Sequence, residues 1–194
     1  MSEIDWKTAL NLLIASGGVL AYVALILELV LHFDDLKAKT MKPNFQLSMK
    51  TIPYRDGNLN THIYVENPKT NWRVADATEC RIRLRILSQS GQELKGTTPL
   101  RWEQTGNDFN QRISAGSQPV DSFALQYDPR HGHISVNVCQ GALNTLSRFR
   151  QFQESVDIEV AVESKEKTVT KYVRGVKLPE QFSLASWPPF VNDC

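Results

Sequence analysis

The residues best suited to chemistry lie in one short segment, where Asp128 is followed by His131 and His133. Two imidazoles and one carboxylate are ligands that zinc accepts, so these three residues are the candidates for a metal site. Pro129 and Gly132 indicate a loop, and no fourth ligand follows at a recognisable spacing. A solvated turn is therefore the favoured interpretation, and we expect neither a metal nor a cofactor.

The three cysteines, Cys80, Cys139 and Cys194, form a second group with possible chemistry. Cys80 and Cys139 both fall in expected strands, and an oxidising compartment would permit a disulfide between them. Cys80, however, shares its face with Ile82 and Leu84, which suits a buried free thiol. Free thiols are the favoured interpretation, and Cys194 ends the chain without a recognisable role.

A third group, Arg81, Arg83 and Arg85, alternates along one expected strand. Arginines in this pattern can meet phosphates or acidic lipid headgroups. The simpler interpretation, which we favour, is a solvent-facing row that pairs with acidic side chains of a neighbouring strand.

Charge and missing motifs exclude several functional classes. The chain has 22 basic and 21 acidic residues, a balance that argues against a nucleic-acid binder. It has no glycine-rich phosphate loop, no nucleophile elbow, no His-Glu-x-x-His and no Cys-x-x-Cys. The sequence therefore predicts a protein that is not an enzyme.

The most distinctive segment of the chain is residues 9–31, which follow a short tail of residues 1–8. Thirteen of these residues are Leu, Ile or Val, and the strongly polar ones are Asn11 and Glu28. As a helix the segment is about 34 Å long, enough to span a bilayer. Trp6 and Lys7 suit the membrane interface before it. The acidic start argues against a cleaved signal peptide, and a buried soluble helix would need a large apolar partner. We therefore expect a single-pass transmembrane helix.

Basic residues around this segment predict its orientation. Lys37, Lys39 and Lys42 follow it, and Lys7 precedes it. Because positive residues favour the cytoplasmic side, we expect a protein of the inner or plasma membrane with its soluble domain in the cytoplasm. The opposite orientation remains the alternative.

Gly17, Ala21, Ala24 and Glu28 lie on one stripe of the expected helix. Small residues allow two membrane helices to approach closely, and a glutamate at the end of the stripe can hydrogen-bond a partner. The stripe supports a hypothesis of helix pairing, and hence of a homodimer, as one of two interpretations. The simpler interpretation, which we favour, is ordinary membrane-helix composition with an interfacial glutamate.

After a charged linker, residues 32–43, the apolar pattern changes to a period of two. Residues 44–194 have the usual size of one domain. We expect about seven to nine short strands and one short helix at Ala142–Phe152, hence a β-sandwich with immunoglobulin-like topology. The expected strands are Phe45–Lys50, His62–Glu66, Thr78–Ser88, Pro99–Glu103, Gln111–Ser114, Val120–Tyr127, Ile134–Cys139, Ser155–Glu163 and Thr168–Val176, with Gly175 marking a bulge in the last.

Parts of this domain resemble a known family. The runs Ile63–Asn67 and Ala75–Leu84 resemble the first hairpin of adhesion-type, immunoglobulin-like domains of uncharacterised prokaryotic membrane-anchored proteins. Ile113–Gly116 followed by Phe123–Leu125 is similar to a later step of the same domains. The resemblance covers roughly 60 of the 194 residues and implies a fold without implying an activity.

The function expected from these features is a membrane-anchored, non-catalytic module that binds another protein and uses the bilayer through residues 9–31. Two alternatives remain. The first is an extracytoplasmic domain for adhesion or ligand sensing. The second is a metal-dependent hydrolase built on Asp128, His131 and His133.

Overall fold

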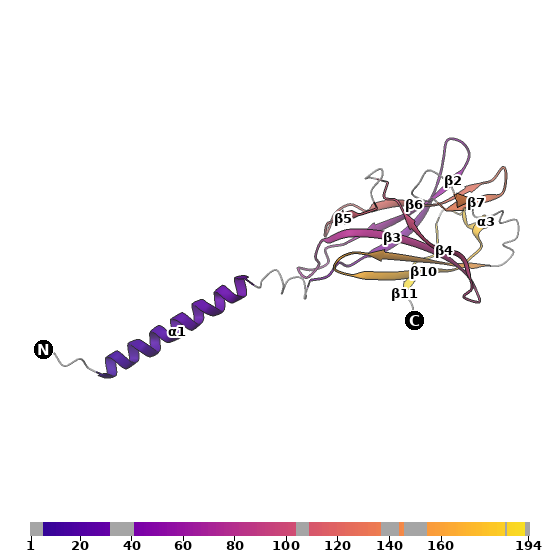
Figure 1. Ribbon diagram of the computed structural model, residues 1–194. Coiled ribbons are helices and arrows are strands. Elements are labelled where there is room, and N and C mark those ends of the chain that lie inside the picture. The colour runs from indigo at the N-terminus through magenta and orange to yellow at the C-terminus, as the bar shows by residue number, and fades with distance from the viewer. Residues whose placement is uncertain are drawn as a thin grey trace. The chain divides into compact units, whose positions relative to one another are not determined.

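The computed structural model describes residues 6–31, 41–103, 109–136, 144–145, 155–184 and 186–192. The chain divides into two compact units, Met1–Met41 and Lys42–Cys194. The first contains the helix α1 (Trp6–Leu31), and the second, called the two-sheet domain below, contains all the strands (Figure 1). Among the residues described, no helix combines the length and the apolar character needed to cross a membrane.

Helix α1 covers the segment that the sequence predicts as helical and begins three residues earlier. Its described large apolar side chains are all exposed: Ile14, Val19, Tyr22, Val23, Leu25, Ile26, Leu27 and Val30. The side chains of Trp6, Lys7, Ala21 and Ala24, and all of Lys37 and Lys39, lie outside the described part of the chain, whereas Lys42 is exposed.

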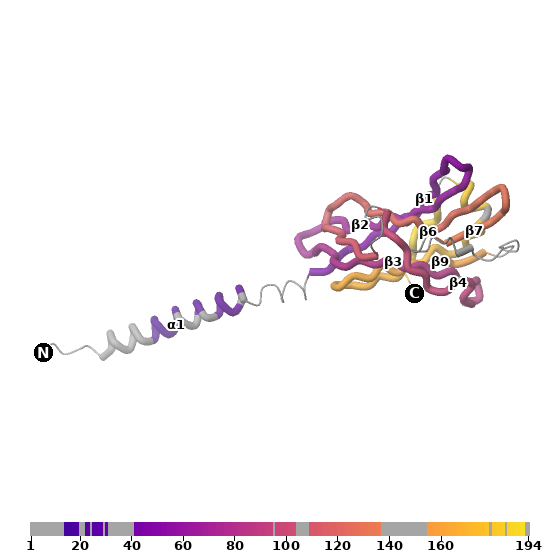
Figure 2. Tube along the Cα trace, turned by 45° about the horizontal axis from the view of Figure 1, so that its top comes forward, coloured from indigo at the N-terminus to yellow at the C-terminus, as the bar shows by residue number. Residues whose placement is uncertain are grey.

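The two-sheet domain consists of two antiparallel sheets. The first has the order β1 (Gln46–Pro53), β2 (Leu59–Glu66), β6 (Val120–Asp128), β7 (His133–Val136), β8 (Asn144–Thr145). The second has the order β11 (Val191–Asn192), β10 (Thr168–Val176), β9 (Val156–Glu163), β3 (Ala77–Ser88), β4 (Glu93–Leu100), and β5 (Gln111–Ile113) also pairs with β3. In Figure 1, β2, β6 and β7 lie above β3, β4 and β10, and Figure 2 shows the chain turned by 45°. The prediction of a mostly β domain is confirmed.

A single apolar core lies between the sheets because alternate residues of their strands face inward. In β3 the buried side chains include Ile82, Leu84 and Ile86, which are paired in register with Val162, Val160 and Ile158 of β9. The first sheet supplies Ile63, Val65 and Leu125, among others, to the same core. The period-two pattern read from the sequence therefore identified the buried face of these strands.

Three local predictions differ from the structure or are refined by it. The strand expected at Pro99–Glu103 ends at Leu100, and Trp102 turns away to form a bridge with Ser122 of the opposite sheet. Asn144 and Thr145 pair with β7 as β8, so the helix expected at Ala142–Phe152 is wrong there, and the rest of that segment lies outside the described residues. The bulge expected at Gly175 is confirmed by a register shift between Val173 and Val176 and by a φ of 67°.

A buried asparagine fixes the end of the domain at which the chain enters. Asn67 is fully buried; its Oδ1 accepts a hydrogen bond from Asn44 N at 2.8 Å. Its Nδ2 donates to Ala75 O at 2.8 Å and to Ile113 O at 3.3 Å. One side chain thus joins the entering chain, the segment before β3, and β5.

Candidate functional site

The candidate metal residues lie in the hairpin between β6 and β7. His131 Nδ1 lies 2.6 Å from Asp128 Oδ2, and this hydrogen bond is the main cause of a lowered pKa for that carboxyl group. The His131 and His133 rings stack at a centroid distance of 5.9 Å. No group of three or more His, Cys, Asp or Glu residues in the described chain is arranged to hold a metal ion. The carboxylate is engaged with one imidazole, and the arrangement is a hydrogen-bonded turn.

The one cysteine in the described residues does not suit nucleophilic chemistry. Cys80 is a free thiol buried in β3, and burial, reinforced by the charge of Glu166, raises its pKa to about 12. A thiol with so high a pKa is almost wholly protonated at neutral pH and is a poor nucleophile. Cys139 and Cys194 lie outside the described residues.

The arginine row of β3 lies on the solvent-facing side of its strand, as the sequence predicts. Arg85 Nη2 lies 2.5 Å from Glu159 Oε2, and Arg83 Nη2 lies 3.2 Å from Glu163 Oε2. Both acids belong to β9, so the expected cross-strand pairing is confirmed for these two arginines. Arg81 differs, because its Nε donates to Asn110 Oδ1 at 2.7 Å, on the other side of β3.

A pocket opens where β3 changes its neighbour on this side. Up to Cys80 the neighbour of β3 is β5, with Cys80 opposite Gln111, whereas from Ile82 onward the neighbour is β4, with Ile82 opposite Leu100. Between these points the chain leaves the sheet after Leu100 and returns before β5. The gap forms a pocket of about 330 Å³ that we call the strand-switch pocket. Its lining residues are Arg81, Ile82, Arg83, Pro99, Phe109 and Asn110.

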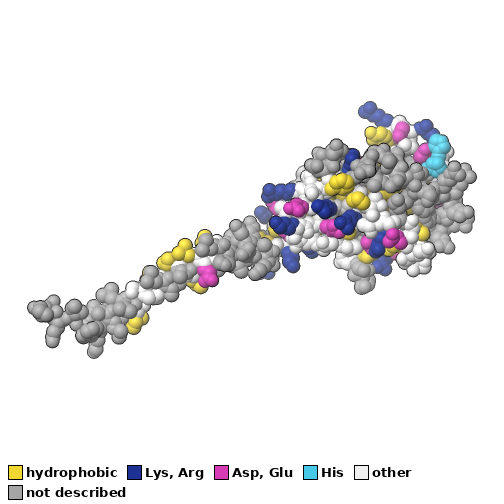
Figure 3. Space-filling view, in the orientation of Figure 1, with side chains coloured by type: hydrophobic (Ala, Val, Ile, Leu, Met, Phe, Trp, Pro, Cys, Tyr) yellow, Lys and Arg dark blue, Asp and Glu magenta, His cyan; other side chains and the backbone are white. Residues whose placement is uncertain are grey.

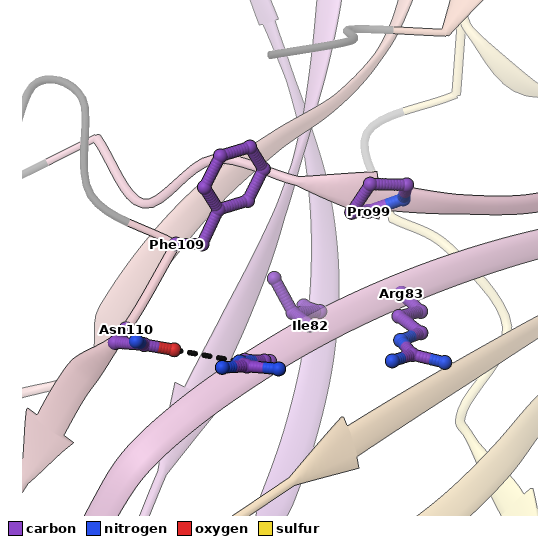
Figure 4. A pocket seen from close by; sticks show the side chains of 6 residues that line it. Ile82, Arg83, Pro99, Phe109 and Asn110 are labelled. Carbon is purple, nitrogen blue, oxygen red and sulfur yellow. Dashed lines mark hydrogen bonds between the residues drawn. The ribbon is translucent and has the colours of Figure 1, made fainter.

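Trp102 links the two sides of this gap. Its side chain is fully buried, and its Nε1 donates to Cys80 O at 3.0 Å and to Phe109 O at 3.1 Å. The indole therefore connects β3 to the backbone of Phe109 and sets the position of that residue. Figure 4 shows Phe109 and Pro99 above Ile82 and Arg83 in this view, and the Asn110 side chain accepts a hydrogen bond from Arg81.

The chemistry of the strand-switch pocket is that of binding. Phe109 and Pro99 offer exposed apolar surface, and the side chains of Arg81 and Arg83 line the same pocket. Guanidinium groups bind carboxylates through paired hydrogen bonds, and they keep their charge at any physiological pH. Among the described residues, the lining has no Ser, Thr, Cys, His or acidic side chain to act as nucleophile or general base. This combination suits an acidic ligand with an apolar portion.

A second cluster lies on the first sheet, across β1, β2 and β6. His62 Nδ1 lies 3.2 Å from Asp121 Oδ2, and the His62 ring stacks on Phe123 at 5.5 Å. Lys50 Nζ lies 5.3 Å from the Tyr64 ring centre. Partial burial, with a contribution from Asp121, raises the pKa of Tyr64. The side chains of this cluster are paired with one another, so we assign the cluster a role in stabilising the first sheet.

Comparison with known proteins adds no family: no family model matches the chain, and a search of curated proteins finds no match.

Sequence reasoning identified Arg81 and Arg83 but missed Pro99, Phe109 and Asn110. The missing signal is the change of partner along β3, because a local pattern does not show which strands pair. The local sequence offers one indication: two large aromatic residues, Trp102 and Phe109, stand on either side of the polar run 103–108.

Proposed function

We propose that this protein is a membrane-anchored, non-catalytic binding module. In this proposal α1 lies in the bilayer, the two-sheet domain is an immunoglobulin-like β-sandwich, and the strand-switch pocket binds an acidic segment of a partner protein. The pocket is the observation on which the binding role rests, because it combines two arginines with exposed apolar surface, and its described lining residues include no catalytic group.

Anchoring is supported by the sequence of residues 9–31, thirteen of which are Leu, Ile or Val, several with side chains outside the described residues. A helix of 26 residues is about 39 Å long, which exceeds the apolar thickness of a bilayer. Its described large apolar side chains are exposed. Lipid is the solvent in which a row of exposed Leu, Ile and Val is favourable. The lysines after the helix favour a cytoplasmic two-sheet domain.

Binding of an acidic segment is supported by the state of the two arginines. The Arg83 side chain remains 42% exposed although it pairs with Glu163. Arg81 uses its Nε for Asn110, and the rest of its guanidinium lies at the pocket. An exposed pair such as Arg83–Glu163 contributes little to stability and can be exchanged for a ligand carboxylate at small cost. Phe109, 39% exposed, supplies the kind of aromatic contact that anchors protein interfaces.

The proposal is tested by photo-cross-linking of the full chain in native membranes. A benzophenone amino acid replaces Phe109 in one variant and Tyr54, in the turn after β1, in the control. Both native residues are exposed aromatics, so the two positions are matched. We expect a discrete cross-linked product from position 109 that is lost when Arg81→Glu and Arg83→Glu are added. Absence of any product at 109, or the same product at both positions, would contradict a partner at the pocket.

A further inference from the structure

The end of the two-sheet domain at which the chain enters has a distinctive surface. Ala75 N donates to Lys42 O, and Lys167 Nζ donates to Pro43 O, so the segment 68–76 and the turn between β9 and β10 lie beside the entering chain. Figure 3 shows Lys and Arg side chains gathered at this end, with acidic ones among them. The segment Lys69–Arg73, called the entry loop below, has two basic residues and no acidic one.

The entry loop displays an aromatic ring next to a cation. Trp72 is 67% exposed, and the Arg73 guanidinium carbon lies 5.0 Å from the centre of its ring. The other two described tryptophans outside α1 are buried: Trp102 at 0% and Trp187 at 7% exposure. Trp72 thus presents an exposed aromatic ring beside a cation, a combination of side chains that favours a membrane interface.

The loop is held firmly in this arrangement. Asn71 Oδ1 accepts a hydrogen bond from Arg73 N at 2.8 Å, a turn that projects the residue between them, Trp72, outward. On both sides the loop is tied to the core of the domain through Asn67, which bonds Asn44 N and Ala75 O. Trp72 is therefore presented by a fixed turn beside the point where the chain enters.

Charge at this end favours an anionic partner. Lys42, Lys69 and Lys165 are exposed in addition to Arg73. Two nearby acids are committed to internal contacts. Asp76 binds Arg112 Nη2 at 2.6 Å and Ala115 N at 2.8 Å, and Glu166 binds Thr78 N and Oγ1.

Exposed acids at this end are fewer. Glu79 is exposed, and Glu66 is half-buried. Lys69 lies beside the turn at Gly116. A Cβ atom built on that glycine would lie 3.3 Å from the Lys69 Cβ. Exposed cations therefore outnumber exposed acids at this end of the domain.

We propose that the entry loop contacts the anionic lipid headgroups of the membrane in which α1 is anchored, with Trp72 at the interface and Lys69 and Arg73 on the headgroup phosphates. This inference rests on the proposed anchoring, because ten residues, 32–41, separate α1 from Lys42 and span at most about 35 Å. Tryptophan and basic residues are the side chains that favour this interface. The contact would hold this end of the domain at the bilayer.

The test uses residues 42–194, which form a compact unit with their own core and lack α1. Its binding to vesicles is measured by flotation, with phosphatidylcholine alone and with equal parts of phosphatidylcholine and phosphatidylglycerol. We expect binding to the anionic vesicles only, weakened by salt, with a blue shift of tryptophan emission that Trp72→Ala abolishes. Lys69→Glu with Arg73→Glu should weaken binding roughly tenfold or more.

Matched controls come from the turn between β1 and β2, at the other end of β1. Tyr54, 61% exposed, and Arg55, also exposed, repeat the aromatic–basic pair about 26 Å away along the strand. Tyr54→Ala with Arg55→Glu should leave vesicle binding unchanged. Equal binding by the entry-loop and control variants, or equal binding to both kinds of vesicle, would overturn the proposal. A second result would also overturn the proposal: an entry-loop variant that binds vesicles normally but loses the cross-link at position 109. That result would indicate that the entry loop contacts a partner protein.

Because the fragment lacks α1, its result is independent of whether the full chain is anchored. Failure of anchoring is read separately, from extraction of the full chain out of membranes.

Discussion

Asn67→Asp is expected to destabilise the two-sheet domain strongly although it changes the side chain by a single group. The native amide accepts one hydrogen bond and donates two, to Ala75 O and Ile113 O. A carboxylate retains the acceptor but presents oxygen to both carbonyl groups. The three segments that meet at this side chain then lose their common contact.

The magnitude follows from the burial of the site. Asn67 is fully buried, so water does not replace the lost donors. Each lost hydrogen bond costs about 1 kcal/mol, and leaving buried acceptors unpaired adds to it, so the total is about 3 kcal/mol. That is a large part of the 5–15 kcal/mol that typically separates folded from unfolded domains.

The assay is urea unfolding of residues 42–194, with Asn71→Asp as the matched control. The Asn71 side chain accepts a hydrogen bond from Arg73 N through Oδ1, an exposed contact that a carboxylate preserves. The control should therefore stay within about 0.5 kcal/mol of the native sequence. A loss below about 1 kcal/mol at Asn67, or equal losses in both variants, would refute the reasoning.

The Asn67→Asp deficit should also depend on pH with a definite sign. Burial and the two facing carbonyl groups disfavour the charged carboxylate, so the pKa of the new carboxyl is higher in the folded than in the unfolded state. The folded variant then binds more protons, and stability falls as pH rises through the folded-state pKa. The deficit relative to the native sequence should be smaller near about pH 5 than near about pH 8. A loss of stability that does not change with pH would contradict the conclusion that this carboxyl group is buried opposite two carbonyl groups.

Three further outcomes are expected. Glu79 has a φ of 52° in β3; Glu79→Gly should therefore raise the free energy of unfolding by up to about 1 kcal/mol, and Glu79→Ala, which keeps the Cβ, should give no gain. With Cys139→Ser and Cys194→Ser removing the other thiols, Cys80 should react with a thiol reagent only after unfolding, because it is buried with a pKa of about 12, and rapid labelling of the folded protein would refute this. Gly17→Leu should weaken self-association of the full chain in detergent if α1 pairs through its stripe of small residues, while unchanged association would remove the stripe as the pairing surface.

The sequence predicted the parts of the fold that depend on local pattern. The alternation along β3 identified Ile82, Leu84 and Ile86 as buried and the arginines between them as solvent-facing. It also predicted cross-strand acids, since a row of one charge on an open face needs a neighbouring row of the other. The bulge at Gly175 was visible because glycine inside a strand pattern is otherwise unfavourable.

Features that depend on pairing between distant strands were missed. Trp102 was placed in a strand because Leu100 and Trp102 alternate, but its indole reaches Cys80 O and its backbone bridges Ser122. The strand-switch pocket follows from this turn, and it joins Phe109 to Arg81 across 28 residues of chain. The role of Asn67 was also hidden, because a side chain that joins three segments is recognisable only when those segments are known to meet.

Whether α1 anchors the two-sheet domain is tested most directly by alkaline carbonate extraction of membranes that contain the full chain. Carbonate removes proteins held by charge but leaves those held by a membrane-spanning helix. The full chain should remain in the membrane pellet, and a chain that begins at Lys42 should be released. Release of the full chain into the supernatant would contradict anchoring through α1.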